Sequence, residues 1–246
     1  MKIQKKRYKV FQIPKNNGKY RTVYSVDQEV KDRLRLILPL LQKIKDNLDA
    51  TNINYAFENG RNCVMGASQH QGNNYSLSMD LVNFFDSVNR EHVRDLISGN
   101  ILENCLIDDS PRQGLPTSPL IATIAFLKFD YLIVKALKRL SENVVYTRYA
   151  DDLTFSFNDP TNNKLIQKIV EEILQDSGFA LNRKKTKFQN KSNGRIVING
   201  VSLGNGKVRP TRKTLKKIRA ARHQNNKDSL RGLLEWAKCK EPKAGA

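Results

Sequence analysis

Two adjacent aspartates stand between two strand-like runs, and this pattern constrains the possible fold more than any other part of the sequence. The runs Asn143–Arg148 and Leu153–Phe157 are rich in β-branched and aromatic residues, which favour strands. Tyr149–Asp152, with the sequence Tyr-Ala-Asp-Asp, joins them. The pattern predicts a hairpin with two carboxylates at its tip, where a tight turn more often carries Asn-Gly or Asp-Gly.

A pair of neighbouring acids has two explanations. Like charges repel, and an Asp-Asp pair in any chain is most often a solvated turn. Asp108 and Asp109, which precede Ser-Pro, are interpreted in this way. The alternative for Asp151 and Asp152 is a bound divalent cation, because Mg²⁺ takes carboxylate oxygens and leaves room for substrate phosphates.

The net charge of +19 over 246 residues indicates a polyanionic partner. Residues 181–246 contain 19 basic and 3 acidic residues, whereas residues 1–180 contain 24 and 21. Solubilising surfaces usually mix both signs, so the basic C-terminal quarter favours nucleic-acid binding over a merely solvated tail. The hydrophobic fraction of 39% is typical of a folded protein rather than a disordered one.

Other sequence features favour a cytoplasmic protein without a membrane partner. No apolar run approaches the length of a transmembrane helix, and the charged N-terminus is not followed by the apolar stretch of a secretory signal. Cys63, Cys105 and Cys239 are too far apart for a zinc motif or a disulfide framework. This cysteine usage fits a reducing compartment.

The first half of the chain alternates between expected strands, helices and loops. Its expected elements are a hairpin of Val10–Ile13 and Tyr20–Tyr24, a helix from Asp27 to Leu48 that Pro39 kinks or splits, a loop over residues 51–75, a strand over Tyr75–Leu81 that carries Asp80, and a helix from about Arg90 to Ser98 that Asn89 caps and Gly99-Asn100 ends.

The second half adds a long apolar helix and a basic end. Its expected elements are a turn over Arg112–Pro119, a helix over Pro119–Leu140, the two strands around Asp151, a helix that Asp159 caps and that runs to about Asp176, strands over residues 186–190 and 195–203, and basic helices over Thr211–His223 and Asp228–Lys238.

This order of elements predicts an α+β architecture, in which helices cover one face of a sheet. In a ferredoxin-like split βαβ arrangement, the strand of Asp80 lies beside the strands that flank Asp151 and Asp152. Three carboxylates would then meet at one place on the sheet and could hold two metal ions for a phosphoryl displacement. Taken alone, Asp80 would be an ordinary strand-end carboxylate.

Five motifs occur in order: Ser78–Asp86 (SMDLVNFFD), Arg112–Pro119 (RQGLPTSP), Arg148–Leu153 (RYADDL), Gly178–Thr186 (GFALN and then KKT) and Ile198–Val201 (INGV). Together they resemble bacterial reverse transcriptases of the retron and group II intron type over roughly residues 10–225. The resemblance implies a right-hand polymerase. Its fingers would be residues 1–75, with 90–118 shared between fingers and palm; its palm would be residues 76–205, and its short basic helical thumb residues 206–246.

The resemblance also implies the chemistry of the site. Asp80, Asp151 and Asp152, with Leu81 beside the first, would hold two Mg²⁺ ions, for which Mn²⁺ can substitute. Asp151 is expected to be the indispensable ligand and Asp152 the more tolerant one. Phe85 matches the aromatic residue that excludes a ribose 2′-hydroxyl and so selects dNTPs. An ordinary core position is the alternative for Phe85, and Phe84 is expected to point the other way, into the core.

Further residues match substrate-binding positions of that family. The implied nucleotide-binding residues are Lys15 (with Lys19 as its rival), Arg21, Gln113, Gly114 and Lys185 (with Lys184 as its rival). The implied primer contacts are Tyr149, Asn199 and Gly200. Solvated basic surfaces and ordinary turns are the alternatives for these positions. Trp236 is expected in a helix core, with base stacking as the alternative.

Two motifs depart from the retron pattern. Gly66–His70 keeps the Ala and His of Asn-Ala-x-x-His but not the Asn, and Ile198–Gly200 replaces Val-Thr-Gly. His70 is interpreted as a loop histidine. The expected function is an RNA-directed DNA polymerase that uses dNTPs to make cDNA, with a cognate structured non-coding RNA as its template. An effector protein or a second copy of the chain is a further candidate partner, and anti-phage defence a candidate role. The alternative is a catalytically idle RNA-binding protein on the same fold.

Overall fold

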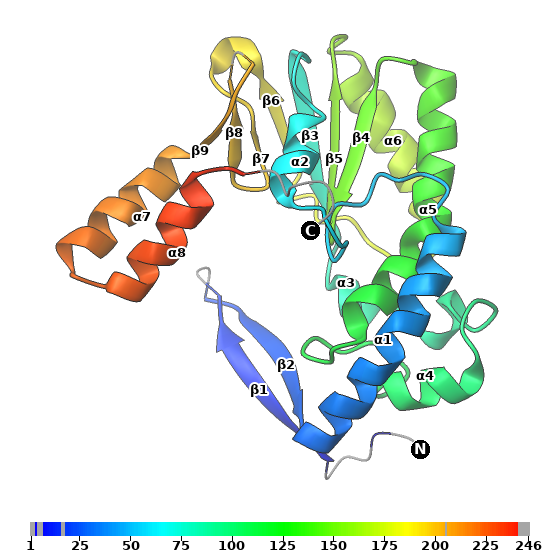
Figure 1. Ribbon diagram of the computed structural model, residues 1–246. Helices are drawn as coiled ribbons and strands as arrows, with labels where there is room; N and C mark the ends of the chain where they lie inside the picture. The colour runs from blue at the N-terminus through cyan, green and yellow to red at the C-terminus, as the bar shows by residue number, and fades with distance from the viewer. Residues whose placement is uncertain (1–2, 4–6, 16–17, 205, 241–246) are drawn as a thin grey trace. The chain divides into compact units, whose positions relative to one another are not determined.

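The computed structural model describes residues 3, 7–15, 18–204 and 206–240. The chain forms two compact units that interleave along the sequence (Figure 1). The first unit contains Met1–Asn52, Val82–Ile133 and Glu172–Ala180, and the second contains Ile53–Leu81, Val134–Glu171 and Leu181–Ala246.

The first unit begins with a two-stranded antiparallel hairpin, as the sequence predicted. Its strands pair from Tyr8 opposite Val26 to Pro14 opposite Tyr20. The elements of this unit are β1 (Tyr8–Pro14), β2 (Tyr20–Val26), α1 (Gln28–Leu48), α3 (Phe84–Ser87), α4 (Gly99–Cys105) and the first part of α5 (Ser118–Leu140).

Helix α1 is capped by Asp27, whose carboxylate accepts a hydrogen bond from the Val30 amide at 2.9 Å. The helix buries one apolar stripe and runs through Pro39 as a single element, so the expected split does not occur. Pro39 and Arg35 lie on the exposed side. The Arg35 carbonyl, which loses its partner at the proline, can therefore be satisfied by water.

The prediction of a helix from Arg90 to Ser98 is wrong, because only its first three residues are helical. Asn89 caps a single 3-10 turn, Arg90–His92, by accepting a hydrogen bond from the His92 amide. The His92 ring also donates to the Ser177 carbonyl at 2.7 Å, which fixes this short turn in place. Gly99 opens α4 instead of ending a helix.

An aromatic cluster forms part of the core of the first unit. Phe84, Phe126, Phe129 and Phe179 lie with ring centroids between 5.1 and 6.0 Å apart. Phe84 is buried, as predicted, although it lies in the helical turn α3 and not in a strand.

The second unit contains two sheets, with strand orders β4-β5-β3-β6 and β7-β8-β9. Its elements are α2 (Cys63–Ser68), β3 (Tyr75–Asp80), the last part of α5, β4 (Val145–Tyr149), β5 (Asp152–Phe157), α6 (Asn162–Leu174) as far as Glu171, β6 (Lys187–Asn190), β7 (Val197–Ile198), β8 (Val201–Leu203), β9 (Val208–Pro210), α7 (Arg212–His223) and α8 (Lys227–Ala237).

The four-stranded sheet is antiparallel throughout, and β3 lies beside β5 as the split βαβ arrangement predicted. Alternation along β3 gives the sheet two different faces. Met79 lines a cavity with Gln167 and Glu171, so Leu77 and Met79 share the face towards α6. Ser76, Ser78 and Asp80 share the other face, where Ser156, opposite Ser76, contacts His70 just after α2.

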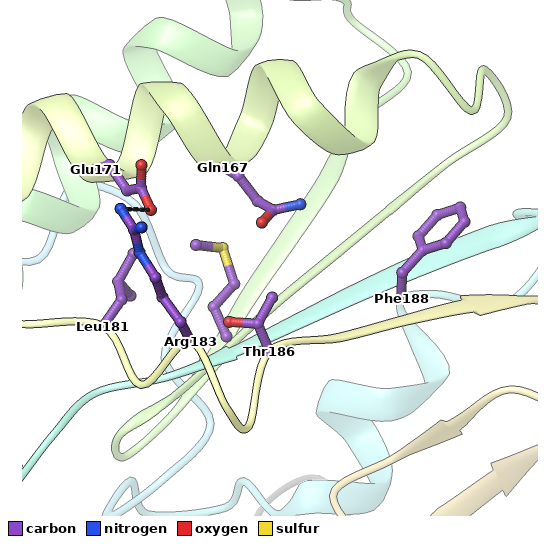
Figure 2. Close-up of a pocket in the computed structure, with 7 residues that line it drawn as sticks. Gln167, Glu171, Leu181, Arg183, Thr186 and Phe188 are labelled. Carbon is purple, nitrogen blue, oxygen red and sulfur yellow. Dashed lines mark ion pairs between the residues drawn. The ribbon is translucent and has the colours of Figure 1, made fainter.

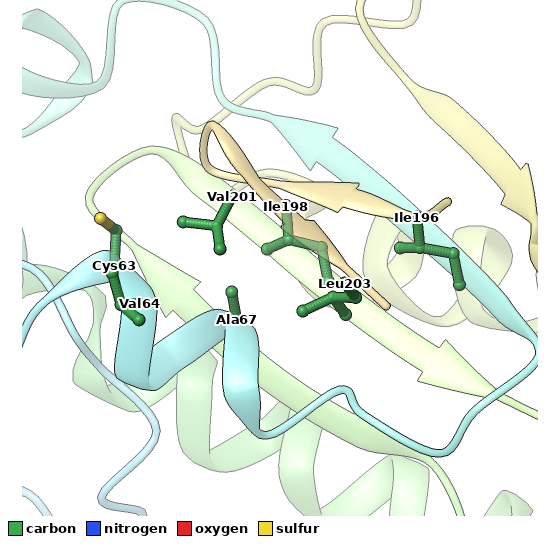
Figure 3. Close-up of a cluster of buried hydrophobic side chains, with 7 residues drawn as sticks. All are labelled: Cys63, Val64, Ala67, Ile196, Ile198, Val201 and Leu203. Carbon is green, nitrogen blue, oxygen red and sulfur yellow. The ribbon is translucent and has the colours of Figure 1, made fainter. Parts of the chain in front are cut away.

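Helix α2 lies inside the stretch that was expected to be a loop, so that expectation is wrong. The Asn62 side chain caps it by accepting hydrogen bonds from the Val64 and Met65 amides. Figure 3 shows the reason the helix is stable: its apolar side packs on the small sheet. The buried cluster consists of Cys63, Val64, Ala67, Ile196, Ile198, Val201 and Leu203.

The strand expected over residues 195–203 is in fact a hairpin of β7 and β8. Asn199 and Gly200 connect the two strands with φ angles of 48° and 80°. Positive φ at both positions is the requirement of the tight turn that Asn-Gly favours. The preceding strand β6 pairs with β3 in the larger sheet.

The two basic C-terminal helices occur where the sequence predicted them. Helix α7 buries Thr214, Ile218 and Ala221. Trp236 of α8 is 38% exposed, so the expectation of a helix-core tryptophan is wrong. None of the helices in the described part of the chain has the length and apolar character needed to cross a bilayer.

Candidate active site

The turn between β4 and β5 places Asp151 and Asp152 near Asp80, at the same end of the neighbouring strands β5 and β3. Tyr149 pairs with Asp152, which leaves Ala150 and Asp151 as the two turn residues, and Ala150 has a φ of 56°. Asp80 lies directly opposite Asp152 in the β3–β5 register. The Leu81 amide donates to the Asp151 carbonyl at 2.9 Å, so β3 is tied to the turn itself.

The carboxylates affect one another electrostatically. Burial, together with the negative charges of Asp151 and Asp80, raises the pKa of Asp152 from 3.8 to about 6, and the Lys185 charge opposes this rise. Hard oxygen donors with crowded negative charge suit a divalent cation, so the donor set fits the predicted metal. Within the described residues, however, no three His, Cys, Asp or Glu side chains are arranged as a group that could hold a metal ion.

Lys185 contacts the first aspartate directly. Its Nζ lies 2.8 Å from Asp80 Oδ1 and 2.7 Å from Oδ2, and the hydrogen bond to Asp80 raises the pKa of the lysine. The Asp80 side chain is only 13% exposed, whereas that of Lys185 is 57% exposed. Of the two candidate lysines, Lys185 is the one that these contacts bring to the carboxylates.

The loop that carries Lys185 is held to β3 by its backbone. The Asn182 amide donates to the Asp80 carbonyl at 2.7 Å, and the Lys185 amide donates to the Asn182 carbonyl at 2.9 Å. On its other side the loop borders a cavity of about 450 Å³ beneath α6. There Arg183 forms an ion pair with Glu171 of α6 at 3.1 Å (Figure 2).

His70 forms hydrogen bonds with both strands of the aspartate hairpin, a contact that the sequence did not indicate. Its Nδ1 lies 2.8 Å from Ser156 Oγ of β5, and its Nε2 lies 2.7 Å from Thr147 Oγ1 of β4. Burial lowers the pKa of His70 to about 3, so the ring is neutral. His70 does lie in the turn that follows α2, as expected of a loop histidine, but its side chain is buried against the sheet.

Arg148 fixes the outer edge of the hairpin. Its amide donates to the Ile53 carbonyl at 3.0 Å, and its carbonyl accepts from the Tyr55 amide at 2.9 Å, so the preceding segment continues the sheet. The guanidinium is fully buried and donates to the Ala150 carbonyl in the turn at 3.3 Å. The turn is thus held by contacts from β3 and from its own strand.

The predicted primer contacts also belong to the second unit. Tyr149 is half-buried and packs against the cluster shown in Figure 3. A Cβ placed on Gly200 would lie 3.5 Å from Cζ2 of Trp236, so the tryptophan ring lies next to the Asn199–Gly200 turn. Trp236 was not among the predicted primer residues.

The remaining predicted residues belong to the first unit. Lys15 and Arg21 are exposed on the β1–β2 hairpin, and the Lys15 amide donates to the Lys19 carbonyl at 2.6 Å. Phe85 is half-buried, with its ring centroid 5.7 Å from that of Phe84. Their roles in nucleotide binding and selection stay predictions.

The Gln113–Gly114 turn packs on strand β2. The Gln113 carbonyl accepts from the Tyr24 amide at 2.8 Å. Gly114 has a φ of 110°, and a Cβ there would lie only 2.3 Å from the Tyr24 carbonyl oxygen. The glycine is therefore required for contact between two segments of the chain itself, a reason that the sequence could not supply.

The chain matches the family model described as reverse transcriptase (RNA-dependent DNA polymerase) over residues 13–198. It is 29% identical to the retron Mx65 reverse transcriptase of Myxococcus xanthus, over 96% of this chain and 62% of that protein. It is also 29% identical to the retron Ec86 and Ec83 reverse transcriptases of Escherichia coli, over 69% and 83% of their lengths and 88% and 96% of this chain. The chain thus spans under two thirds of the Mx65 protein.

Solved structures share its fold at low sequence identity. A telomerase from Candida albicans, in complex with a fragment of telomeric RNA, matches with a TM-score of 0.61 and 14% identity over 86% of this chain and 47% of its own. A foamy viral protease-reverse transcriptase with double-stranded DNA matches with a TM-score of 0.51 and 18% identity, over 87% and 32%. This likeness bears out the predicted polymerase fold of mixed helix and sheet.

Proposed function

The chain belongs to the reverse transcriptase family, and on that premise we propose that it is an RNA-directed DNA polymerase that makes cDNA by two-metal nucleotidyl transfer. The register that sets Asp80 opposite Asp152, with Asp151 in the adjoining turn, is the observation that carries the proposal. It gathers acidic oxygen donors at one sheet edge, which is the arrangement that transfer to a primer 3′-hydroxyl requires.

In this mechanism Asp80, Asp151 and Asp152 would hold the cations, with Leu81 beside Asp80. Bound divalent ions supply charge stabilisation for the attacking and leaving oxygens. Lys185 contributes a positive charge at the same edge, close to the leaving pyrophosphate. Because Asp152 has a pKa of about 6, it is ionised and able to act as a ligand at neutral pH.

Further predicted residues are assigned to substrate binding and selection. We assign dNTP selection to Phe85 and triphosphate binding to Lys15 and Arg21, whose forked guanidinium suits phosphate. Gln113 and Gly114 contact the templating pair, and the primer contacts are Tyr149, Asn199 and Gly200. The basic helices α7 and α8 hold the template–primer duplex through its backbone, so this binding should weaken with salt.

The natural template proposed here is a cognate structured non-coding RNA. Support comes from the relatives named as retron reverse transcriptases. An effector protein or a second copy of the chain would join the RNA in an anti-phage role. Sequencing the RNA and cDNA that copurify with the protein identifies the template, and a random sample of cellular RNA would contradict a cognate one.

Primer extension tests the polymerase activity. The parent protein with an RNA template, a DNA primer, dNTPs and Mg²⁺ should extend the primer, and the double variant Asp151→Asn with Asp152→Asn should not. The matched control changes the exposed pair, Asp108→Asn with Asp109→Asn, and should retain activity. If the parent incorporates no nucleotide with either Mg²⁺ or Mn²⁺, the enzyme proposal fails and RNA binding alone is left.

A further inference from the structure

The ammonium of Lys185 covers both carboxylate oxygens of Asp80, at 2.8 and 2.7 Å. A divalent cation that binds Asp80 needs at least one of these oxygens. An ammonium and a metal ion on the same carboxylate face would also repel each other. The two cations therefore compete for one position.

We propose that Lys185 is the resident counter-ion of Asp80, and that cation binding displaces its ammonium and frees it to face the substrate. This inference rests on the proposed function, because it concerns the same carboxylates. It adds an order of events: the lysine becomes available only after Asp80 has exchanged its partner.

The backbone around Lys185 is fixed, whereas its side chain can move. Asn182 is tied to the Asp80 carbonyl, and Arg183 is tied to Glu171 of α6 (Figure 2). The Lys185 side chain is 57% exposed on a flexible four-carbon stem, so it can leave without disturbing the loop. Asp80 is mostly buried and stays in place to receive the cation.

Charge balance favours exchange over simultaneous binding. Asp80, Asp151 and Asp152 share one edge, and Lys185 reduces their mutual repulsion. A divalent ion does so more strongly because it brings two charges. The displaced ammonium then lies beside a site that receives a triphosphate, to which a mobile point charge can adapt.

Metal affinity measured without substrate tests the exchange. Isothermal titration of Mn²⁺ into the whole chain would compare the parent with Lys185→Met, Lys185→Arg and the exposed, charge-matched control Lys184→Met. Lys185→Met should bind Mn²⁺ about fivefold more tightly, as expected for losing one partly exposed charge-assisted competitor. Lys184→Met should match the parent, and Lys185→Arg, which keeps the charge, should bind no more tightly than the parent.

Chemical labelling follows the displacement itself. Acetylation of the parent is read by mass spectrometry with and without Mg²⁺. Without Mg²⁺ the ammonium of Lys185 is paired with Asp80 and protected, so adding Mg²⁺ should speed acetylation of Lys185 and leave that of Lys184 unchanged. Equal Mn²⁺ affinity of the parent and Lys185→Met, or weaker binding by that variant, would overturn the inference while leaving the polymerase proposal intact. Failure of the parent and Lys185→Met alike to bind Mn²⁺ would overturn both.

Discussion

Replacing Asp152 with asparagine should stabilise the metal-free protein at neutral pH. The folded state raises the pKa of this carboxyl from 3.8 to about 6, first through burial and then through Asp151 and Asp80. Above about pH 6 this carboxyl is ionised in both the folded and the unfolded state, but its ionisation costs more free energy in the folded state. The unfavourable contribution is complete above pH 6 and disappears as the pH falls to 3.8.

The size of the gain follows from this shift. A rise from 3.8 to about 6 corresponds to roughly 3 kcal/mol at 1.4 kcal/mol per unit. Solvent screening of the partly exposed carboxylate reduces it to about 1–2 kcal/mol. Because asparagine has nearly the same shape but no charge, Asp152→Asn should raise the Tm by about 3–6 °C for a chain of this length.

Thermal melts followed by circular dichroism in EDTA provide the assay. Parent and Asp152→Asn should differ most near pH 7.5 and converge towards pH 4, and Mg²⁺ should narrow the gap by stabilising the parent more than the variant. Asp108→Asn, in an exposed loop, serves as the control and should melt like the parent. Equal Tm values at pH 7.5, or a gain that persists unchanged at pH 4, would refute the electrostatic reasoning.

Three further substitutions test other parts of the structure. His70→Ala should lower the unfolding free energy by about 3–5 kcal/mol in urea, because it leaves a cavity and removes the shared partner of two hydroxyls; a loss below 1 kcal/mol would contradict the support role. Gly114→Ala should cost about 2–4 kcal/mol, whereas Gly72→Ala, also at positive φ but with open space around its Cβ, should cost only about 1 kcal/mol; equal costs would exclude the clash with Tyr24. Phe85→Ala should raise NTP incorporation relative to dNTP in primer extension, and unchanged selection would remove Phe85 from the sugar-selecting role.

The sheet that carries the aspartates could be predicted because its information is local. Alternating β-branched and aromatic residues on both sides of Asp151-Asp152 define the hairpin, and the split βαβ arrangement placed the strand of Asp80 beside it. The exact register, with Asp80 opposite Asp152, was not predicted. Helix α5 was predicted from a long apolar run behind a Gly/Pro turn, and α7 and α8 were predicted as short basic helices. In each case one stretch of sequence contained both the element and its ends.

The missed features depend on partners far away in the sequence. Helix α2 has only six residues, too few to be stable alone, and it is held by residues more than a hundred positions later. His70 lies just after that helix, so its burial could not be foreseen once the helix was missed. The cap formed by Asn62 was the one local signal, and it was hidden in a stretch rich in Asn and Gly.

His70 and Asp152 lie on the same side of one sheet, and burial shifts their pKa values in opposite directions because it disfavours the charged form of each. His70, with a folded pKa of about 3 instead of 6.5, lowers stability as the pH falls below 6.5. Asp152 raises stability as the pH falls from about 6 to 3.8. Between about pH 4 and 6 the two effects oppose each other. At neutral pH, therefore, the ionised Asp152 lowers the stability of the fold, whereas His70 is uncharged. A divalent cation bound at Asp152 would offset this loss of stability.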